Sequence, residues 1–258
     1  MHSKAKKLEA FSRLLDIMDK LRSDCPWDKK QTFETLRHLT IEETYELGDA
    51  ILDNDLVEIK KELGDLLLHI VFYSKIGSET NTFDIADVCN TISDKLIYRH
   101  PHIYGDTKAT TEEEVKRNWE QLKLKEGKGK KSILEGVPKS LPAMVKASRM
   151  QEKVAAVGFE WENNKQFLDK LTEEITEFNI EKEKQDIDKM EAEFGDVLFA
   201  LINYARFQKI NPENALERTN KKFIKRFQLV EKQAKENGLE IADVSLKTLL
   251  SYWEKAKA

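Results

Sequence analysis

The stretch "EAEFGDVLFALINY" at residues 191–204 combines an apolar helical pattern with two acids, and "KELGDLLLHIVFY" at residues 61–73 repeats the combination. Glu193 and Asp196 lie three residues apart with Gly195 between them, beside a run apolar enough for a buried helix. Glycine inside a helix costs about 1 kcal/mol relative to alanine, and a buried carboxylate is costly unless a partner compensates it. A core helix that carries both indicates that the acids have a function.

These stretches belong to an internal repeat with a constant offset of 131 residues, as Glu193 and Glu62 show. "IEETYELGDAI" (41–51) matches "TEEITEFNIEK" (172–182) at this offset. The flanks match more loosely, "CPWDKKQTF" (25–33) with "GFEWENNKQF" (158–167) and "ISDKLIYRH" (92–100) with "RTNKKFIKR" (218–226). The acidic positions are kept while most residues between them differ. The repeat therefore predicts two similar domains in tandem.

The hydrophobic pattern predicts an all-α fold. Together with the repeat and its acids, it leads us to expect two helical domains in tandem. Each would be built on an antiparallel helical hairpin that carries an acidic metal site. The expected helices are 4–22, 33–53, 55–76, 84–99, 112–125, 140–156, 165–183, 187–209, 213–237 and 246–257. The glycines, prolines and lysines of residues 126–142 indicate a linker. We expect domains over residues 1–125 and 143–258.

Composition excludes several function classes. The net charge of −4 argues against nucleic-acid binding, which needs a basic surface. No apolar run has the length of a membrane span, and the N-terminus has the pattern of a mature amphipathic helix. Cys25 and Cys89 have no metal-binding or redox spacing, so we expect reduced thiols in a cytoplasmic protein.

A reversal of the chain brings the acids of each copy together. If the chain turns at Asn54, Glu46 and Glu62 each lie eight residues from the turn, and Glu43 and Asp65 each lie eleven residues from it. An antiparallel hairpin then gathers all four carboxylates. The second copy has the same symmetry about Gln185, which places Glu177 against Glu193 and Glu174 against Asp196.

Four neighbouring carboxylates repel one another unless they are protonated or bind a cation. Oxygen-only ligands suit Mg²⁺, with Mn²⁺ as a substitute. The candidate ligands are Glu43, Glu46, Glu62 and Asp65 in copy one, and Glu174, Glu177, Glu193 and Asp196 in copy two. Glycine beside the metal-binding acid, as at Gly64, would let a helix or a phosphate approach closely. Salt-bridged surface acids are the simpler alternative, but they explain neither the symmetry nor its repetition.

A di-iron site would need Glu-x-x-His on facing helices, a spacing that this sequence lacks. His69 follows Asp65 by four residues, but the matching residue in copy two is Ala200. We interpret His69 as a packed or capping histidine.

Basic residues downstream of the acids are candidates for phosphate binding. In "TNKKFIKRF" (219–227), Lys222 and Arg226 share a helix face at i and i+4, with Lys221 and Lys225 beside them. Copy one has the same spacing at Lys95 and Arg99 before Pro101 ends the helix. An ordinary solvated basic face is the alternative. Trp253 is the tryptophan that we expect near a nucleotide base.

Together these motifs resemble the MazG family of nucleoside triphosphate pyrophosphohydrolases in its two-domain bacterial form. "CPWDKKQTF", "LEGVPKSLPA", "VGFEW" and "NKKFIKRF" add to the acidic hairpins. The resemblance implies a homodimer, Mg²⁺ dependence and hydrolysis of NTPs to NMP and pyrophosphate. It also implies that Lys222 and Arg226 hold phosphates and that Trp253 lies near the nucleotide.

We therefore expect an enzyme that clears excess or non-standard nucleotides, with small-molecule NTPs as substrates. Copy two has the fuller basic helix, so its acids are the expected catalytic set: Glu173, Glu174, Glu177, Glu193 and Asp196. Glu173, or Glu42 in copy one, is a candidate general base, and equally a salt-bridge partner or a group that orients a ligand. The alternatives are a non-catalytic nucleotide-sensing helical dimer and a narrower dUTPase- or dCTPase-like enzyme.

Overall fold

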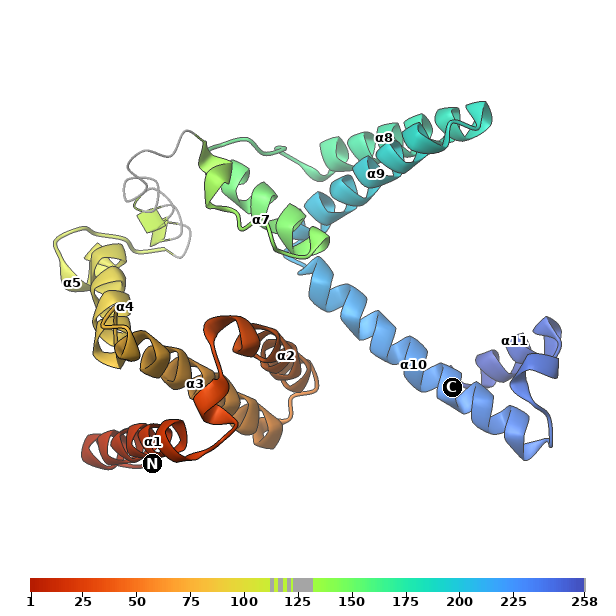
Figure 1. The fold of residues 1–258 in the computed structure, drawn as a ribbon. Helices are drawn as coiled ribbons and strands as arrows, with labels where there is room; N and C mark the ends of the chain where they lie inside the picture. Colours follow the sequence, from red (N-terminus) through yellow and green to blue (C-terminus); the bar gives the residue numbers. More distant parts are fainter. Residues whose placement is uncertain (112–113, 116–117, 120–121, 123–131, 258) are drawn as a thin grey trace. The chain divides into compact units, whose positions relative to one another are not determined.

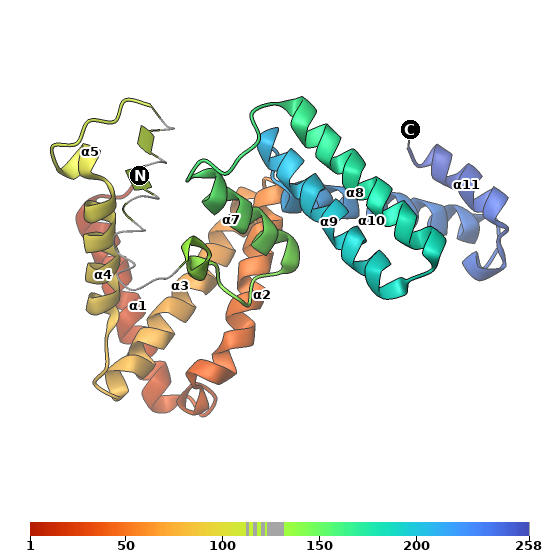
Figure 2. The same cartoon turned by 90° about the horizontal axis from the view of Figure 1, so that it is seen from above.

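The computed structural model describes residues 1–111, 114–115, 118–119, 122 and 132–257, and every regular element in these ranges is helical (Figure 1). The chain divides into two compact units, Met1–Trp119 and Glu120–Ala258. Each unit contains one antiparallel helical hairpin (Figures 1 and 2). These findings confirm the expected all-α tandem fold. None of the described helices is long and apolar enough to span a membrane.

The first unit is built around three helices that share one core. Its elements are α1 (Lys4–Asp24), a 3₁₀ turn (Asp28–Lys30), α2 (Phe33–Leu52), α3 (Leu56–Glu79), α4 (Ile85–Arg99) and α5 (Pro101–Tyr104). The core residues are Met18 of α1, Leu36 of α2, and Val71, Phe72 and Ile76 of α3. The hairpin of α2 and α3 is thus held against α1 by buried apolar side chains.

The turn of the first hairpin lies at Asn54, midway between the paired acids, as the sequence predicted. Asn54 adopts a left-handed backbone conformation with φ of 55°, which asparagine tolerates better than most residues. Asp55 then caps α3, because its side chain accepts hydrogen bonds from the backbone N–H groups of Val57 and Glu58. In the second unit Gln185 ends its helix at φ of 57°, so both predicted reversals are confirmed.

The second unit contains a second hairpin and a long helix that leaves it. Its elements are a 3₁₀ turn (Ile133–Gly136), α7 (Ala143–Ala155), α8 (Asn164–Lys184), α9 (Ile187–Phe207), α10 (Pro212–Glu236), a 3₁₀ turn (Ile241–Asp243) and α11 (Leu246–Lys255). α7 packs on α9, and α11 packs on the far part of α10 around Val230, Ala234 and Tyr252. α10 runs away from the α8–α9 hairpin (Figure 1).

Each hairpin is closed by a pair of aromatic residues. Phe33 at the start of α2 stacks on Tyr73 of α3, with ring centroids 5.7 Å apart. Phe167 of α8 contacts Tyr204 of α9, with ring centroids 6.4 Å apart. Tyr73 and Tyr204 are separated by the repeat offset of 131 residues. An aromatic pair thus links the two helices of each hairpin, and the tyrosine is the member of the pair that the repeat keeps.

The region between the units is described only in part. The expected helix over residues 112–125 and the first residues of the expected linker, 126–131, lie largely outside the described residues. Within the linker range, the turn Ile133–Gly136 packs against α7. The domain limits at residues 125 and 143 stay a prediction.

Candidate metal centre

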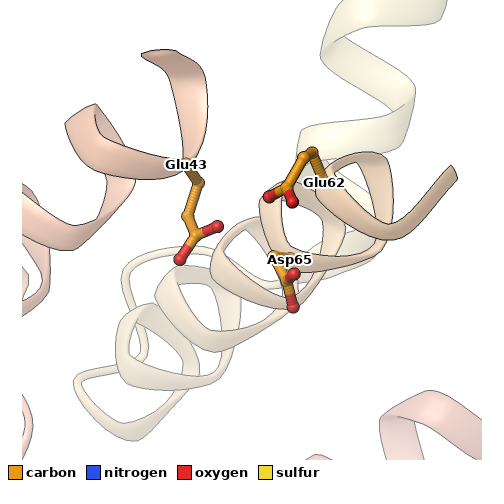
Figure 3. A group of neighbouring side chains, drawn as sticks. All are labelled: Glu43, Glu62 and Asp65. Carbon is orange, nitrogen blue, oxygen red and sulfur yellow. The ribbon is translucent and has the colours of Figure 1, made fainter. Parts of the chain in front are cut away.

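Three carboxylates of the first hairpin face one another across the gap between its helices. Glu43 comes from α2, and Glu62 and Asp65 come from α3 (Figure 3). One carboxylate oxygen from each lies within 4.8 Å of the others. Glu62 is only 1% exposed, and the other two acids are half-buried. The two helices thus bring together a compact set of carboxylate oxygens that could hold a metal ion.

The electrostatics of this cluster fit a bound cation. The Oε2 atom of Glu62 is buried and has no hydrogen-bond partner among the described residues. Lys61 Nζ lies 2.9 Å from Glu62 Oε1 and holds the pKa of Glu62 below its usual value, against the opposing effect of burial. Burial and the charges of Asp65 and Glu46 raise the pKa of Glu43. A divalent cation would ligate the orphaned oxygen and offset the repulsion.

The second hairpin carries a corresponding cluster, which shares two of its three repeat positions with the first. Glu174 and Glu177 of α8 and Glu193 of α9 each place one carboxylate oxygen within 4.8 Å of the others. Burial raises the pKa of Glu177, and the charges of Glu174 and Glu193 add to that effect. Lys170 Nζ lies 2.8 Å from an oxygen of Glu174 and 2.8 Å from one of Glu173. Both copies therefore pair a lysine with a buried acid of the cluster.

The fourth acid of each predicted set lies outside these groups. Glu46 and Asp196 are both exposed. Each follows a cluster member by three residues, Glu43 and Glu193 respectively, so each shares the helix face of that ligand. Their part in metal binding stays a prediction.

The two candidate bases have different surroundings. Glu173 forms an ion pair with Lys170 at 2.8 Å, which fits the salt-bridge role that the sequence left open. Glu42 is exposed. Which of them accepts a proton stays a prediction.

Among the described residues, neither Lys222 nor Arg226 contacts the acids of the same unit. Lys222 is exposed and Arg226 is half-buried, and both lie on α10. α10 as a whole diverges from the α8–α9 hairpin (Figure 1). Trp253 packs on Phe223, with the two ring centroids 5.1 Å apart. It also contacts the apolar core that α10 and α11 form around Val230. The remaining predicted residues are Lys221 and Lys225 on α10, and Lys95 and Arg99 on α4.

The glycines beside Asp65 and Asp196 leave open space next to their helices. A Cβ atom added at Gly64 or Gly195 would meet no atom within 4 Å, apart from its own helix and chain neighbours. No described part of the chain therefore uses the space that these glycines leave. Close approach by a phosphate or by another helix stays a prediction.

Sequence reasoning missed the two lysines that touch the clusters. Lys170 precedes Glu173 and Glu174 by three and four residues, a spacing that could have indicated the contact. Lys61 is adjacent to Glu62 in the sequence, so helical periodicity gave no signal for it.

His69 is packed, as predicted. It is 7% exposed, and its Nδ1 atom lies 2.8 Å from the Thr40 hydroxyl. That hydroxyl also contacts the Tyr73 hydroxyl at 2.6 Å. His69 therefore belongs to a polar group that ties α2 to α3.

We expect Glu43→Gln to raise the Tm of the metal-free protein at pH 7. The raised pKa of Glu43, caused first by burial, means that the folded state binds this proton more tightly than the unfolded chain. Its contribution to stability therefore falls as the pH rises through the raised pKa. The glutamine variant has no charge at this position and therefore avoids this loss of stability. Its higher Tm relative to the wild type should diminish as the pH falls toward the ordinary pKa range of a carboxyl group. Thermal denaturation against pH measures the effect.

Glu34→Gln on the same helix is the matched control. A hydrogen bond from the Thr32 side chain lowers the pKa of Glu34, so this variant should lower the Tm at pH 7. Added Mg²⁺ should stabilise the wild type more than Glu43→Gln, because the variant lacks one charged ligand. An unchanged or lower Tm for metal-free Glu43→Gln would show that burial and repulsion among the carboxylates do not destabilise the metal-free protein.

Comparison with known proteins matches both hairpins to one family. The MazG nucleotide pyrophosphohydrolase domain matches residues 31–104 and 162–230. A nucleoside triphosphate pyrophosphohydrolase of Escherichia coli (strain K12) is 43% identical over 257 residues, which cover 97% of this chain and 98% of that protein. The nucleoside triphosphate pyrophosphohydrolase/pyrophosphatase MazG of Thermotoga maritima is 41% identical over 250 residues, which cover 96% of this chain and 95% of that protein. A crystal structure of a mazG-related protein from Thermotoga maritima has a TM-score of 0.39 and 26% identity, covering 44% of this chain and 98% of that chain.

Proposed function

The chain belongs to the MazG family of nucleotide pyrophosphohydrolases, and from this premise we propose that it hydrolyses NTPs to NMP and pyrophosphate with Mg²⁺. The observation that carries the proposal is the pair of acidic clusters, each gathered by a helical hairpin inside a matched domain. Clearance of excess or non-standard nucleotides in the cytoplasm is the role that we assign to the enzyme.

The residues of copy two would divide the chemistry between them. Glu174, Glu177 and Glu193, with Asp196 beside them, would hold Mg²⁺ or Mn²⁺, which supplies charge neutralisation for the polyphosphate when it is bound. Hydrolysis at the α-phosphorus needs a water in line with the leaving pyrophosphate and an acceptor for its proton. The acid that precedes the first ligand, Glu173 in copy two, is the candidate acceptor.

Phosphate contacts have to come from basic side chains outside the hairpin. Lys222 and Arg226 lie one turn apart on α10 and present donors for the non-bridging oxygens. Since α10 runs away from the hairpin of its own unit, we propose that a second copy of the chain supplies these residues.

Exposed apolar side chains on the second hairpin support a homodimer. Ile175 of α8 is 44% exposed, and Phe194 and Leu198 of α9 are 50% and 43% exposed. Burying such a stripe against another helix is favourable at about 25 cal/mol per Å². A second hairpin would complete a four-helix packing and would also explain the open space at Gly195.

Product analysis tests the proposed reaction. Wild-type protein with Mg²⁺ and ATP in ¹⁸O-labelled water should release AMP and pyrophosphate, with the label in AMP. ADP and phosphate would contradict attack at the α-phosphorus. Binding of Mg·NTP without turnover across several nucleotides would favour the nucleotide-sensing dimer, whereas turnover of only dUTP or dCTP would favour the narrower enzyme.

A further inference from the structure

A second polar group links the two helices of the first hairpin, one turn away from the acidic cluster of copy one. On α2, Thr40 precedes Glu43 by three residues. On α3, His69 follows Asp65 by four residues, and Tyr73 follows after four more. At these spacings Thr40 and His69 each share a helix face with an acid of the cluster. We call the group of Thr40, His69 and Tyr73 the Thr40 triad.

The hydroxyl group of Thr40 uses all of its hydrogen-bonding capacity inside the hairpin. Its oxygen lies 3.1 Å from the Leu36 carbonyl oxygen, 2.8 Å from His69 Nδ1 and 2.6 Å from the Tyr73 hydroxyl. A hydroxyl group has one proton to donate and two lone pairs that accept. Since the Leu36 carbonyl only accepts, it receives this proton, and both bonds from α3 are donated to the hydroxyl oxygen. The triad therefore ties α3 to α2 through two hydrogen bonds.

Packing holds the triad in place. His69 is 7% exposed, and its ring meets the ring of Tyr73 edge-on, with the centroids 6.3 Å apart. Burial lowers the pKa of His69, against the opposing effect of the Asp65 charge. The ring is therefore largely neutral at pH 7 and adds no positive charge beside the cluster.

The acids of copy one need such a link because they repel one another. Glu43 on α2 faces Asp65 on α3 across the hairpin (Figure 3), and burial together with the charge of Asp65 raises the pKa of Glu43. This repulsion acts to separate the two helices when no metal is bound. A metal site needs ligands that neighbouring side chains already hold close to the bonding geometry. Hydrogen bonds one turn away from both acids keep the spacing of α2 and α3.

Copy two does not repeat the triad. At the repeat offset of 131 residues, Thr40 corresponds to Leu171. His69 corresponds to Ala200. Apolar side chains thus replace both groups, although α8 and α9 still pack as an antiparallel pair. The hairpin fold does not require the triad, which indicates that the triad serves the site of copy one.

We propose that the Thr40 triad positions the metal ligands of copy one, with His69 as the positioning residue that holds α3 to α2. The proposal rests on the proposed function only for the divalent metal in the acidic cluster. His69 acts through Glu43 and Asp65 and does not bind the metal. Copy one should therefore bind a divalent metal when no nucleotide is present.

Titration of the full chain with Mn²⁺ tests this role, because Mn²⁺ replaces Mg²⁺ at oxygen ligands and EPR distinguishes its free and bound forms. The parent protein is Glu193→Gln, which weakens the site of copy two. In this parent, His69→Ala should weaken Mn²⁺ binding to copy one about 10-fold, the lower limit when a group that orients a metal ligand is lost. His69→Asn should keep most of the affinity, because its Nδ2 group takes the place of Nδ1 and donates to Thr40.

Val71→Ala is the matched control for stability. Val71 is 2% exposed on the same helix, so its truncation removes core packing and leaves the triad intact. Both Val71→Ala and His69→Ala should lower the Tm of the metal-free protein, whereas only His69→Ala should weaken Mn²⁺ binding. In a Glu62→Gln parent, which keeps the site of copy two, His69→Ala should leave the remaining Mn²⁺ affinity unchanged.

Several results would contradict the proposal. Unchanged Mn²⁺ affinity in His69→Ala would show that the triad only stabilises the fold, and an equal loss in Val71→Ala would show general destabilisation. A loss in His69→Asn as large as in His69→Ala would exclude the bond to Thr40 as the cause. A Glu193→Gln parent that binds no Mn²⁺ at copy one would have no site to position.

Turnover of NTPs by the wild type is measured separately and tests the proposed function alone. If the wild type hydrolyses NTPs and His69→Ala binds Mn²⁺ normally, the function stands and the role of the triad is wrong. If the variants show the expected pattern of Mn²⁺ affinities in a chain that hydrolyses no NTP, the role of the triad stands and the function is wrong.

Discussion

Glu193→Gln should reduce NTP turnover by about 10²–10³, the usual cost of removing one group that stabilises charge in a transition state. Glu193 belongs to the cluster with Glu174 and Glu177, and the amide keeps its size while removing one of the charges that attract the metal. Steady-state release of NMP at saturating Mg²⁺ measures the loss. Recovery at very high Mg²⁺ would show that the effect acts through metal affinity.

The repeat supplies a matched control at Glu62. Glu62→Gln changes the residue 131 positions earlier, in the acidic cluster of the first hairpin. If copy two is the main catalytic site, the loss of turnover in Glu62→Gln should be far smaller than in Glu193→Gln. Calorimetry should still detect one weakened metal site in each variant. Equal losses of activity would contradict our preference for copy two and indicate that both sites work.

The sequence predicted the hairpins because their signals are local. Asn54 and Gln185 lie at the midpoints of the acidic symmetry, and both adopt the left-handed conformation that ends a helix. Helical periodicity then fixes which residues face the partner helix. This was sufficient to bring three of the four predicted acids together in each copy.

The rest depended on contacts between distant residues. The direction of α10 follows from packing at the end of α9, which no short motif encodes, so the sequence could not place Lys222 relative to the acids. The same is true of the contact between α7 and α9. Gln151 and Phe199 lie 48 residues apart in the sequence and meet only because these helices pack together.

Mixed dimers should recover activity from two inactive variants. Glu193→Gln disables the acids of one chain, and Lys222→Ala removes the phosphate contact from the other. If Lys222 reaches the acids of the partner, a heterodimer contains one site with both groups intact. Random exchange makes half of the dimers heterodimers, so a mixture should recover about a quarter of wild-type turnover when monomers exchange freely. Each variant alone should stay inactive.

The result decides between two arrangements that the sequence alone does not separate. If Lys222 served the acids of its own chain, every site in the mixture would lack one group and no activity would return. Mixing Glu193→Gln with Glu177→Ala provides the control, because both substitutions fall in the same acidic cluster and no pairing of these chains restores a site. Recovery in that control would mean that acids from two chains form one metal centre. If turnover returned only in the mixture that contains Lys222→Ala, α10 would bind the substrate held by the acids of the partner chain. That role would explain why α10 diverges from the hairpin of its own unit.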